Sequence, residues 1–168
     1  MQKTRKSNGV VRRNLTEALL RLLEEKRLDE ITVTELVAHA QVARVSFYRN
    51  FDSLDEVLAC AVRQVASEWL EEVGPDLRHR DPHAYMLALL RKVYEQRRLN
   101  DVLMKSDRMD ILRAEFSNAF GVGCADRRES ARRAFLAGGL YNLVYRWTLS
   151  DYDSTPEALA DFVYEMIN

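Results

Sequence analysis

The chain has 168 residues, of which 47% are hydrophobic and 30% are charged. This length and composition are normal for a folded protein with one sizeable domain, or with two small domains that share a core. No apolar run approaches the ~20 residues that a membrane-spanning helix needs, and the basic first residues lack the apolar core of a signal peptide. We therefore expect a cytoplasmic protein rather than a membrane-spanning or secreted one.

The net charge of −1 hides an asymmetry along the chain. Residues 1–50 carry 10 Lys and Arg against 6 Asp and Glu, a net charge of +4, whereas residues 51–168 carry 15 against 20, a net charge of −5. A basic segment joined to an acidic body favours a polyanionic partner for that segment alone. Cys60 and Cys124 lie far apart without metal-ligand spacing, so we expect two reduced thiols.

Apolar residues repeat at helical spacing throughout the chain, and no strand-like alternation bounded by turn residues occurs. We therefore expect an all-α protein with eight or nine helices. The first fifty residues hold one long helix and two short ones. The expected helices cover residues 8–26, 33–40, 44–50 and 53–73, a segment that starts at residue 82, one or two broken helices within 100–120, residues 126–150, and a last helix that ends near residue 166.

Local patterns mark several helix ends. The stretches TVTE, residues 32–35, and SLDE, residues 53–56, are capping boxes. STPE, residues 154–157, caps the last helix. Pro82 stands at the first position of its helix, where its missing N–H costs nothing. Gly74 ends the helix that begins with SLDE.

The two short helices are separated by only a few residues and follow a longer helix that can cover them. This layout is that of a helix-turn-helix, whose second helix enters the major groove of DNA. With Phe47 pointing at the core, Phe51 falls nearby, and the other side chains of the second helix point outward or to its flanks. Arginine reads guanine, an apolar group meets the thymine methyl, and hydroxyls hold phosphates. The outward and flanking residues are Arg44, Val45, Ser46, Tyr48 and Arg49.

Residues 31–62, ITVTELVAHAQVARVSFYRNFDSLDEVLACAV, resemble the DNA-binding region of the TetR/AcrR (tetracycline-repressor-like) transcriptional regulators. The resemblance rests on the SFYRNF core with both flanking capping boxes in register, and it covers about residues 10–62. The remainder fits that family only in being helical, of similar length and ending in two helices. The resemblance implies base-facing roles for Arg44, Val45 and Ser46, with Thr34 at the start of the second helix, a phosphate contact for Tyr48, and phosphate or base contacts for Arg49 and Asn50.

Four positions depart from the pattern of that family. Gln41 stands where the family usually has the turn glycine, so a non-glycine would adopt a left-handed conformation at a cost of ~1 kcal/mol. Ala43 replaces the usual serine cap, which forfeits on the order of 1 kcal/mol. Val45 replaces a frequent glycine, and Leu54 replaces a common lysine and so removes a phosphate contact. These departures predict a recognition helix with its own base preference.

Other interpretations stay open. Residues 41–51 would also suit a short surface helix in a helical bundle, because helix-turn-helix shapes are common packing units. An enzyme is the weaker alternative, because there is no glycine-rich phosphate loop, no Ser/His/Asp spacing and no metal signature, and we expect no cofactor. His79 and His83 have helical spacing for a metal, but Pro82 between them favours a solvated loop. His39 suits a surface or capping role.

The basic residues near the N-terminus have two interpretations. Lys3, Arg5 and Lys6, and the pair Arg12–Arg13, would suit phosphate contacts or an arm in the minor groove. Solubility and disorder of the first seven residues are the alternative. Arg12–Arg13 are the better candidates because a helix fixes them.

Aromatic and sulfur-containing side chains accumulate after residue 69. In the resembled family the equivalent region holds an effector pocket, so these side chains would line one. Filling a core is the other interpretation, since Met and aromatic residues at helical spacing usually do that. The candidate pocket residues are Trp69, Tyr85, Met86, Leu89, Met104, Met109, Phe116, Phe120 and Tyr141.

The expected helix 126–150 carries Gly138 and Gly139 in its middle, where each glycine costs about 1 kcal/mol relative to alanine. Small residues permit close approach of another helix. The resemblance implies that the last two helices pair with their mates as a four-helix dimer interface, and an ordinary core or a glycine kink is the alternative. The candidate interface residues are Phe135, Gly138, Gly139, Leu143, Trp147, Leu159, Phe162, Val163 and Met166.

The sequence therefore predicts a DNA-binding domain over residues 1–52 and a helical effector-binding and dimerisation domain over residues 53–168, connected by helix 53–73. The function it favours is a homodimeric transcriptional regulator, a repressor released from a palindromic operator by a small-molecule effector. The competing hypotheses are a family member without such an effector and an all-α ligand-binding protein that has lost DNA binding.

Overall fold

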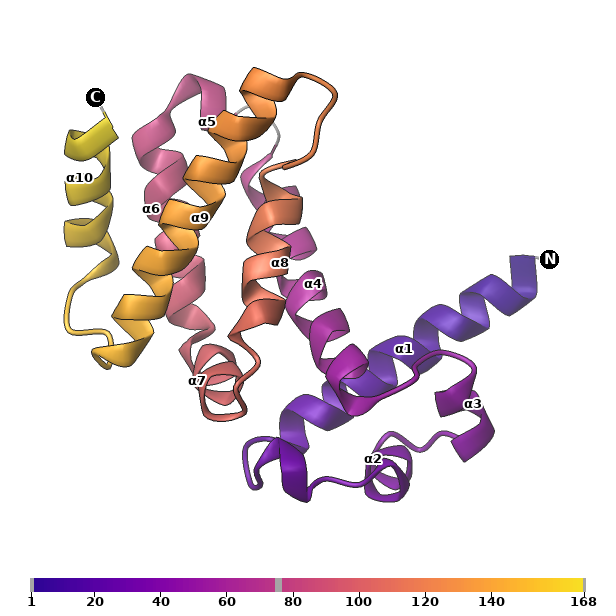
Figure 1. The fold of residues 1–168 in the computed structure, drawn as a ribbon. Coiled ribbons are helices and arrows are strands. Elements are labelled where there is room, and N and C mark those ends of the chain that lie inside the picture. Colours follow the sequence, from indigo (N-terminus) through magenta and orange to yellow (C-terminus); the bar gives the residue numbers. More distant parts are fainter. Residues whose placement is uncertain (1, 75–76, 168) are drawn as a thin grey trace. The chain divides into compact units, whose positions relative to one another are not determined.

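The computed structural model describes the backbone of residues 2–74 and 77–167, and the side chains of residues 8–74, 77 and 80–166. Every element within these residues is a helix (Figure 1), which confirms the expected all-α class. The chain divides into two compact units, Met1–Gln64 (unit 1) and Val65–Asn168 (unit 2). The boundary falls inside one helix, whereas the sequence predicted a domain boundary just before that helix.

Unit 1 is built from one long helix and two short ones, followed by the first part of a second long helix. The first helix begins at Gln2 rather than residue 8, and it ends at Leu22 because residues 23–26 form tight turns. A single 3-10 turn, which the sequence pattern did not predict, follows it. The elements are α1 (Gln2–Leu22), η1 (Leu28–Glu30), α2 (Val33–His39), α3 (Arg44–Tyr48) and α4 (Leu54–Val73).

The hydroxyl bond of each capping box predicted in unit 1 forms. The Thr32 hydroxyl accepts a hydrogen bond from the Glu35 N–H at 3.2 Å, and the Ser53 hydroxyl accepts one from the Glu56 N–H at 3.1 Å. The Glu35 carboxylate binds the Lys26 ammonium, and this hydrogen bond is the main cause of a lowered pKa of Glu35. These local bonds fix where α2 and α4 begin. Buried apolar residues from four helices then form the core: Leu15, Ala18, Leu19, Leu22, Leu36, Val37, Phe47, Phe51, Val57, Leu58, Ala61 and Val62.

The turn between α2 and α3 is a Schellman motif on a non-glycine residue. The Val42 N–H donates to the Val37 carbonyl at 3.0 Å, and the Gln41 N–H donates to the Ala38 carbonyl at 3.2 Å. Gln41 has a φ of 54°, in the left-handed region that favours glycine. The sequence-based expectation of a left-handed Gln41 is thus confirmed. The same bond pair closes α8 at Gly121, where glycine supplies the conformation without strain.

In unit 2, side-chain caps begin three of the helices, α6, α9 and α10. Asp81 accepts from the Ala84 N–H at 2.9 Å, and Asp126 accepts from the Glu129 N–H at 2.8 Å. The cap of the last helix is Thr155, whose hydroxyl accepts from the Ala158 N–H. The one-turn helix α5 was not predicted. The elements are α5 (Leu77–Arg80), α6 (Pro82–Glu95), α7 (Arg97–Lys105), α8 (Met109–Ala119), α9 (Arg127–Leu149) and α10 (Pro156–Ile167).

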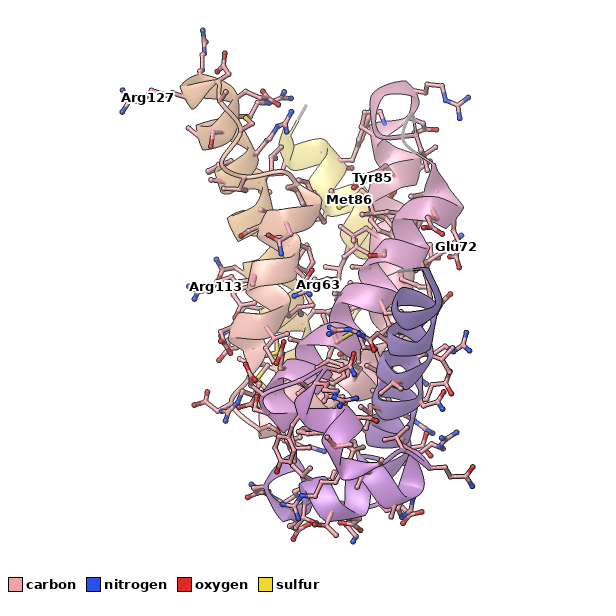
Figure 2. The ribbon with its side chains drawn as sticks, turned by 90° about the vertical axis from the view of Figure 1, so that its right-hand side faces the viewer. Arg63, Glu72, Tyr85, Met86, Arg113 and Arg127 are labelled. Carbon is pink, nitrogen blue, oxygen red and sulfur yellow. The ribbon has the colours of Figure 1, made fainter. Side chains whose placement is uncertain are left out.

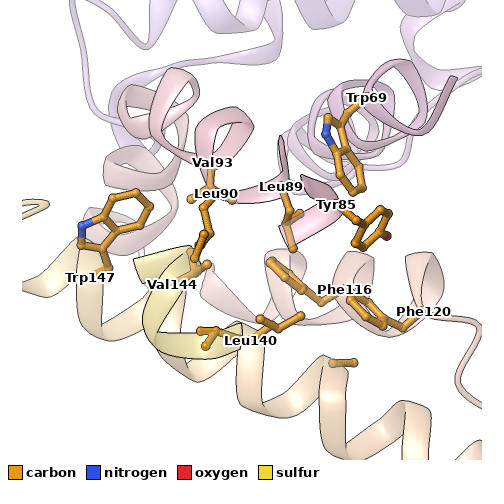
Figure 3. Packing of buried hydrophobic residues seen from close by; sticks show 13 residues of the cluster. Trp69, Tyr85, Leu89, Leu90, Val93, Phe116, Phe120, Leu140, Val144 and Trp147 are labelled. Atoms are coloured by element: carbon orange, nitrogen blue, oxygen red, sulfur yellow. The ribbon is translucent and has the colours of Figure 1, made fainter. Parts of the chain in front are cut away.

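The core of unit 2 is one apolar cluster. In this unit α10 packs against α6, and α8 packs against α9 (Figure 1). Figure 3 shows the cluster, with Tyr85 beside Trp69 and Phe116 beside Phe120. Its buried members are Trp69, Tyr85, Leu89, Leu90, Val93, Phe116, Phe120, Ala137, Leu140, Val144, Trp147, Ala160 and Val163.

None of the described helices is both long and apolar enough to span a bilayer.

Gln41→Gly should stabilise the protein by about 0.5–1 kcal/mol, because glycine removes the left-handed strain while adding some chain entropy to the unfolded state. Urea unfolding of the full chain, followed by far-UV circular dichroism, measures the change. The matched control is Ala38→Gly inside α2, where φ is not positive and glycine should lower stability by up to about 1 kcal/mol. Destabilisation by both variants would contradict the strain at Gln41.

Candidate functional site

The outer surface of α3 presents the side chains that the sequence singled out. Val45 is 56% exposed and Tyr48 is 53% exposed, although large apolar side chains usually avoid water. Arg44 and Arg49 are exposed as well, Ser46 is half-buried, and Thr34 on α2 is exposed. The helical phase predicted from Phe47 is therefore the observed one.

Two phenylalanines hold this surface to unit 1. Phe47 is 0% exposed, and Phe51 is almost fully buried, with 6.3 Å between the two ring centroids. Burial of a side chain of this size contributes roughly 1.5–3 kcal/mol. The Tyr48 ring meets the Phe47 ring edge to face at 5.2 Å, so the exposed tyrosine rests on the buried anchor.

Arg44 and Tyr48 lie one turn apart on α3 and contact each other. An Arg44 Nη2 donates to the Tyr48 hydroxyl at 3.3 Å, and the guanidinium carbon lies 5.7 Å from the tyrosine ring centroid. The contact restricts both long side chains on an exposed face. Because its orientation is already restricted, the Arg44 guanidinium loses less entropy when it forms a bidentate hydrogen bond with a partner.

Asn50 has a local role that the sequence analysis did not predict. Its amide Nδ2 donates to the Ser46 carbonyl at 2.8 Å, and the side chain is half-buried. It thereby satisfies a carbonyl in the last turn of α3 that has no partner within the helix. One of the two N–H groups of the amide is thus engaged within α3, and the role of Asn50 as a phosphate or base contact stays a prediction.

Arg12 of α1 binds the end of α3 from inside unit 1. Its Nη1 donates to the Asn50 carbonyl at 2.8 Å, its guanidinium carbon lies 4.3 Å from the Phe51 ring centroid, and its Nη2 lies 3.5 Å from the Cys60 sulfur. The expectation of a phosphate contact does not fit this geometry, because the guanidinium is committed to protein groups. The sequence carried one clue: Arg12 lies one turn before the buried residues Leu15 and Thr16.

The other basic candidates differ from Arg12. Arg13 is exposed, and its Nε lies 3.9 Å from a Glu17 carboxylate oxygen, so its guanidinium remains accessible. The side chains of Lys3, Arg5 and Lys6 lie outside the described residues. Of the pair Arg12–Arg13, only Arg13 is therefore exposed and open to a phosphate contact.

The candidate pocket residues are largely brought together in unit 2. Trp69, Tyr85, Leu89, Phe116 and Phe120 belong to the apolar cluster, and Met86 and Tyr141 pack against it. Burial raises the pKa of the Tyr141 hydroxyl. Met104 and Met109 lie outside the cluster, on α7 and α8.

The candidate interface residues divide by burial. Phe135 is 80% exposed, and Phe162 and Met166 are more than half exposed, whereas Leu143 and Leu159 are half-buried against the cluster. Trp147 and Val163 belong to the core of unit 2, which leaves little of either side chain for contact with a second copy. A Cβ added at Gly138 or Gly139 would meet nothing within 4 Å, so neither glycine is required by packing inside the chain.

The histidines form no metal site among the described residues, where no group of three His, Cys, Asp or Glu side chains converges. His83 lies on α6 rather than in a loop, and its Nε2 lies 2.7 Å from an Asp161 carboxylate oxygen on α10. The side chain of His79 lies outside the described residues. Both cysteines are free thiols.

Neither a protein-family model nor a curated protein matches this chain. Among the solved structures that match, two are similar along nearly the whole length of both chains. Lin0861 from Listeria innocua superposes with a TM-score of 0.73 at 18% identity, covering 92% of this chain and 90% of that one. The TetR family repressor AlkX from Dietzia sp. strain DQ12-45-1b superposes with a TM-score of 0.56 at 13% identity, covering 93% of this chain and 92% of that one.

The chain has a TetR-like fold. This confirms the fold that the resemblance of residues 31–62 predicted, and it extends the likeness to α5–α10, where the sequence showed no shared motif. Within the TetR-like fold, α2 and α3 form the helix-turn-helix of unit 1.

Arg12→Ala should lower the free energy of unfolding by about 2 kcal/mol, because it removes a charged hydrogen bond and a cation–π contact from a half-buried site. Urea unfolding of the full chain measures this loss. Arg13→Ala is the matched control, since it removes an exposed pair worth at most ~1 kcal/mol. Equal losses in the two variants would contradict the role of Arg12 as an internal tie.

Proposed function

We propose that the protein is a sequence-specific DNA-binding transcriptional regulator, a repressor that binds a palindromic operator as a homodimer and is released by a small-molecule effector. The observation that carries the proposal is the outer surface of α3. This surface exposes arginine, valine and tyrosine side chains. It belongs to the second helix of a helix-turn-helix, and Phe47 anchors that helix in the core of unit 1. The repressor AlkX, which has a similar fold, adds support.

Each exposed residue of α3 suits one part of a DNA duplex. Arg44 would donate two hydrogen bonds to the O6 and N7 of a guanine. Val45 would contact a thymine methyl, and Tyr48 and Arg49 would bind phosphates. Thr34 at the start of α2 would contact the backbone or a base edge beside α3. The arginine–tyrosine contact within α3 supports this division, because it aligns the guanidinium before DNA binds.

A homodimer is supported by the outer faces of α9 and α10. On α9, Phe135 and Gly139 point away from the core of unit 2, and Phe162 and Met166 do so on α10. Two helix-interior glycines cost about 1 kcal/mol each, and no intramolecular contact requires them. Close approach of a helix from a second copy would offset that cost.

The charges of the two helices favour the same partner. The first turns of α9 are rich in arginine, with Arg127 (Figure 2) and Arg128 exposed at its start. Helix α10 has acidic residues and no basic ones; Glu157 and Asp161 pair with Arg91 and His83 within the chain, and Glu165 is exposed. A second copy related by two-fold symmetry would set a basic end against an acidic helix twice. The two recognition helices would then reach successive major grooves, ~34–36 Å apart.

The effector would act on unit 2. Its aromatic and methionine side chains support binding of a largely apolar small molecule. AlkX is implicated in the biodegradation of n-alkanes, which is a property of that protein and gives only general support. Binding would lower DNA affinity by favouring a dimer in which the recognition helices have the wrong separation.

Arg44→Ala and Arg49→Ala should have different effects on DNA binding. Loss of Arg44 should relax specificity at one base pair of each half-site, by about 1–3 kcal/mol. Loss of Arg49 should weaken binding to all sequences equally, and it should lower the slope of log affinity against log salt concentration by about 1. Binding sites selected from a random duplex library, and affinities measured over a range of salt, report both effects.

Arg98→Ala is the matched control for these variants, because it removes an exposed arginine of α7 in unit 2. It should leave specificity unchanged. If the wild-type protein selects no sequence and shows no salt-sensitive binding, the proposed function is wrong. If the wild-type protein binds DNA and both α3 variants bind it with unchanged affinity and specificity, α3 is not the recognition element.

Phe135→Lys should weaken the homodimer roughly 30-fold or more, because it places a charge at the centre of an apolar contact. Sedimentation velocity over a range of protein concentrations measures the dissociation constant. Val122→Lys, an exposed apolar residue between α8 and α9, is the control and should have no effect.

Gly139→Ala is a second test of the proposed dimer interface. In an isolated subunit alanine should raise stability by about 1 kcal/mol, whereas in a close helix contact between copies it should weaken association. A wild-type protein that is monomeric at all concentrations, or a Gly139→Ala dimer as tight as wild type, would contradict the interface.

A further inference from the structure

The indole N–H of Trp69 is buried without an acceptor. Trp69 is 5% exposed, and its Nε1 has no hydrogen-bond partner among the described residues. Trp147, equally buried, donates its Nε1 to the Ser154 carbonyl at 3.1 Å. Because buried polar groups are nearly always paired, an unpaired donor, at about 1–3 kcal/mol, requires an explanation.

The surroundings of Trp69 are apolar and adaptable. The Tyr85 ring lies beside the indole, with 5.3 Å between the centroids, and the stacked pair Phe116 and Phe120 lies on the other side of Tyr85 (Figure 3). Met86 follows Tyr85 on α6 and is only partly buried against the cluster (Figure 2). Methionine is flexible and adjusts its shape to a neighbour, so this edge of the cluster can repack around a guest.

We propose that the Trp69 N–H is the polar anchor of the effector site, and that the effector is a neutral, predominantly apolar molecule with a hydrogen-bond acceptor such as a ketone or ester carbonyl. This rests on the proposed function, in which unit 2 binds the effector. The acceptor satisfies the donor of Trp69, which has no partner among the described residues, while the rest of the molecule contacts aromatic rings.

We expect an uncharged effector because of the side chains around the indole. The ring beside the indole, Tyr85, is uncharged, and the buried carboxylate of α8, Glu115, already has an interaction within the protein. An ionised group placed among these side chains would lose its hydration without gaining a counter-charge, at a cost well above the gain from a single hydrogen bond. A carbonyl loses far less on burial and recovers that loss by accepting from the indole.

The test uses two probes of nearly equal shape, 2-acetonaphthone and 2-ethylnaphthalene, of which only the first has an acceptor. Equilibrium dialysis measures their dissociation constants for the wild-type protein and for Trp69→Phe. The variant should bind 2-acetonaphthone roughly 10-fold more weakly, the equivalent of one hydrogen bond. It should bind 2-ethylnaphthalene within about 2-fold of wild type, since the ring contacts remain.

Trp147→Phe is the matched control, because it removes a buried indole whose N–H already has an acceptor. It should change the two dissociation constants by the same factor. The two variants should also differ in their free energy of unfolding. Trp147→Phe should be the less stable, because it leaves the Ser154 carbonyl without its hydrogen-bond donor, whereas Trp69→Phe removes a donor that had no acceptor.

A second measurement on the wild-type protein does not depend on the folding of a variant. The chain has two tryptophans, so a nitrogen–proton correlation spectrum contains two indole signals, assigned from the two variants. Addition of 2-acetonaphthone should move the Trp69 proton downfield as its hydrogen bond forms, and 2-ethylnaphthalene should not. A preference for the ketone that survives Trp69→Phe, or no binding of either probe, overturns the proposal.

Failure of this inference is separable from failure of the proposed function. Operator binding is measured on the same preparations without a probe, so salt-sensitive DNA binding can stand while the ketone effect is absent. Binding of 2-acetonaphthone through Trp69 that leaves DNA affinity unchanged would overturn the effector role of the site.

Discussion

The burial of Phe47 is the interaction on which the rest of unit 1 depends. Helix α3 has five residues, too few to be stable alone, because nucleating a helix costs more than one turn of hydrogen bonds returns. Its N-cap, Ala43, offers no side-chain acceptor. The helix persists because Phe47 and Phe51 enter the core and Arg12 binds its carboxyl end. The exposed side chains of α3 are therefore positioned from inside the protein.

The local weaknesses of this segment lie beside its exposed surface. The left-handed Gln41 and the uncapped Ala43 each cost about 1 kcal/mol, and both precede α3. Native proteins break local rules mainly where function requires it, and the cost is offset elsewhere. Here the cost is offset by the burial of Phe47 and Phe51 and by the hydrogen bond from Arg12 to the Asn50 carbonyl. These contacts keep the orientation of α3 even though the turn before it is strained.

The sequence predicted what depends on near neighbours. The caps at Thr32 and Ser53, the start of α6 at Pro82, and the inward phase of Phe47 follow from residues within one or two turns. Contacts between distant segments were not predictable: Arg12 reaches Asn50, 38 residues away, and an amphipathic pattern does not say whether an arginine on a helix edge faces solvent or a carbonyl. The helix α9 carries apolar side chains around much of its surface, so periodicity could not assign Trp147 to the core and Phe135 to solvent.

Three features of the chain lack something that a second molecule would supply, and each differs in chemistry. The surface of α3 exposes guanidinium groups beside valine and tyrosine, which suits a polyanion with apolar methyl groups. The outer faces of α9 and α10 expose phenylalanine and methionine around unneeded glycines, which suits another helix pair of the same kind. Trp69 holds one donor in an apolar core, which suits a small neutral acceptor. A self-sufficient domain could remove these features by a few substitutions, and their joint presence is what the proposed function requires: DNA, a second copy and an effector as partners.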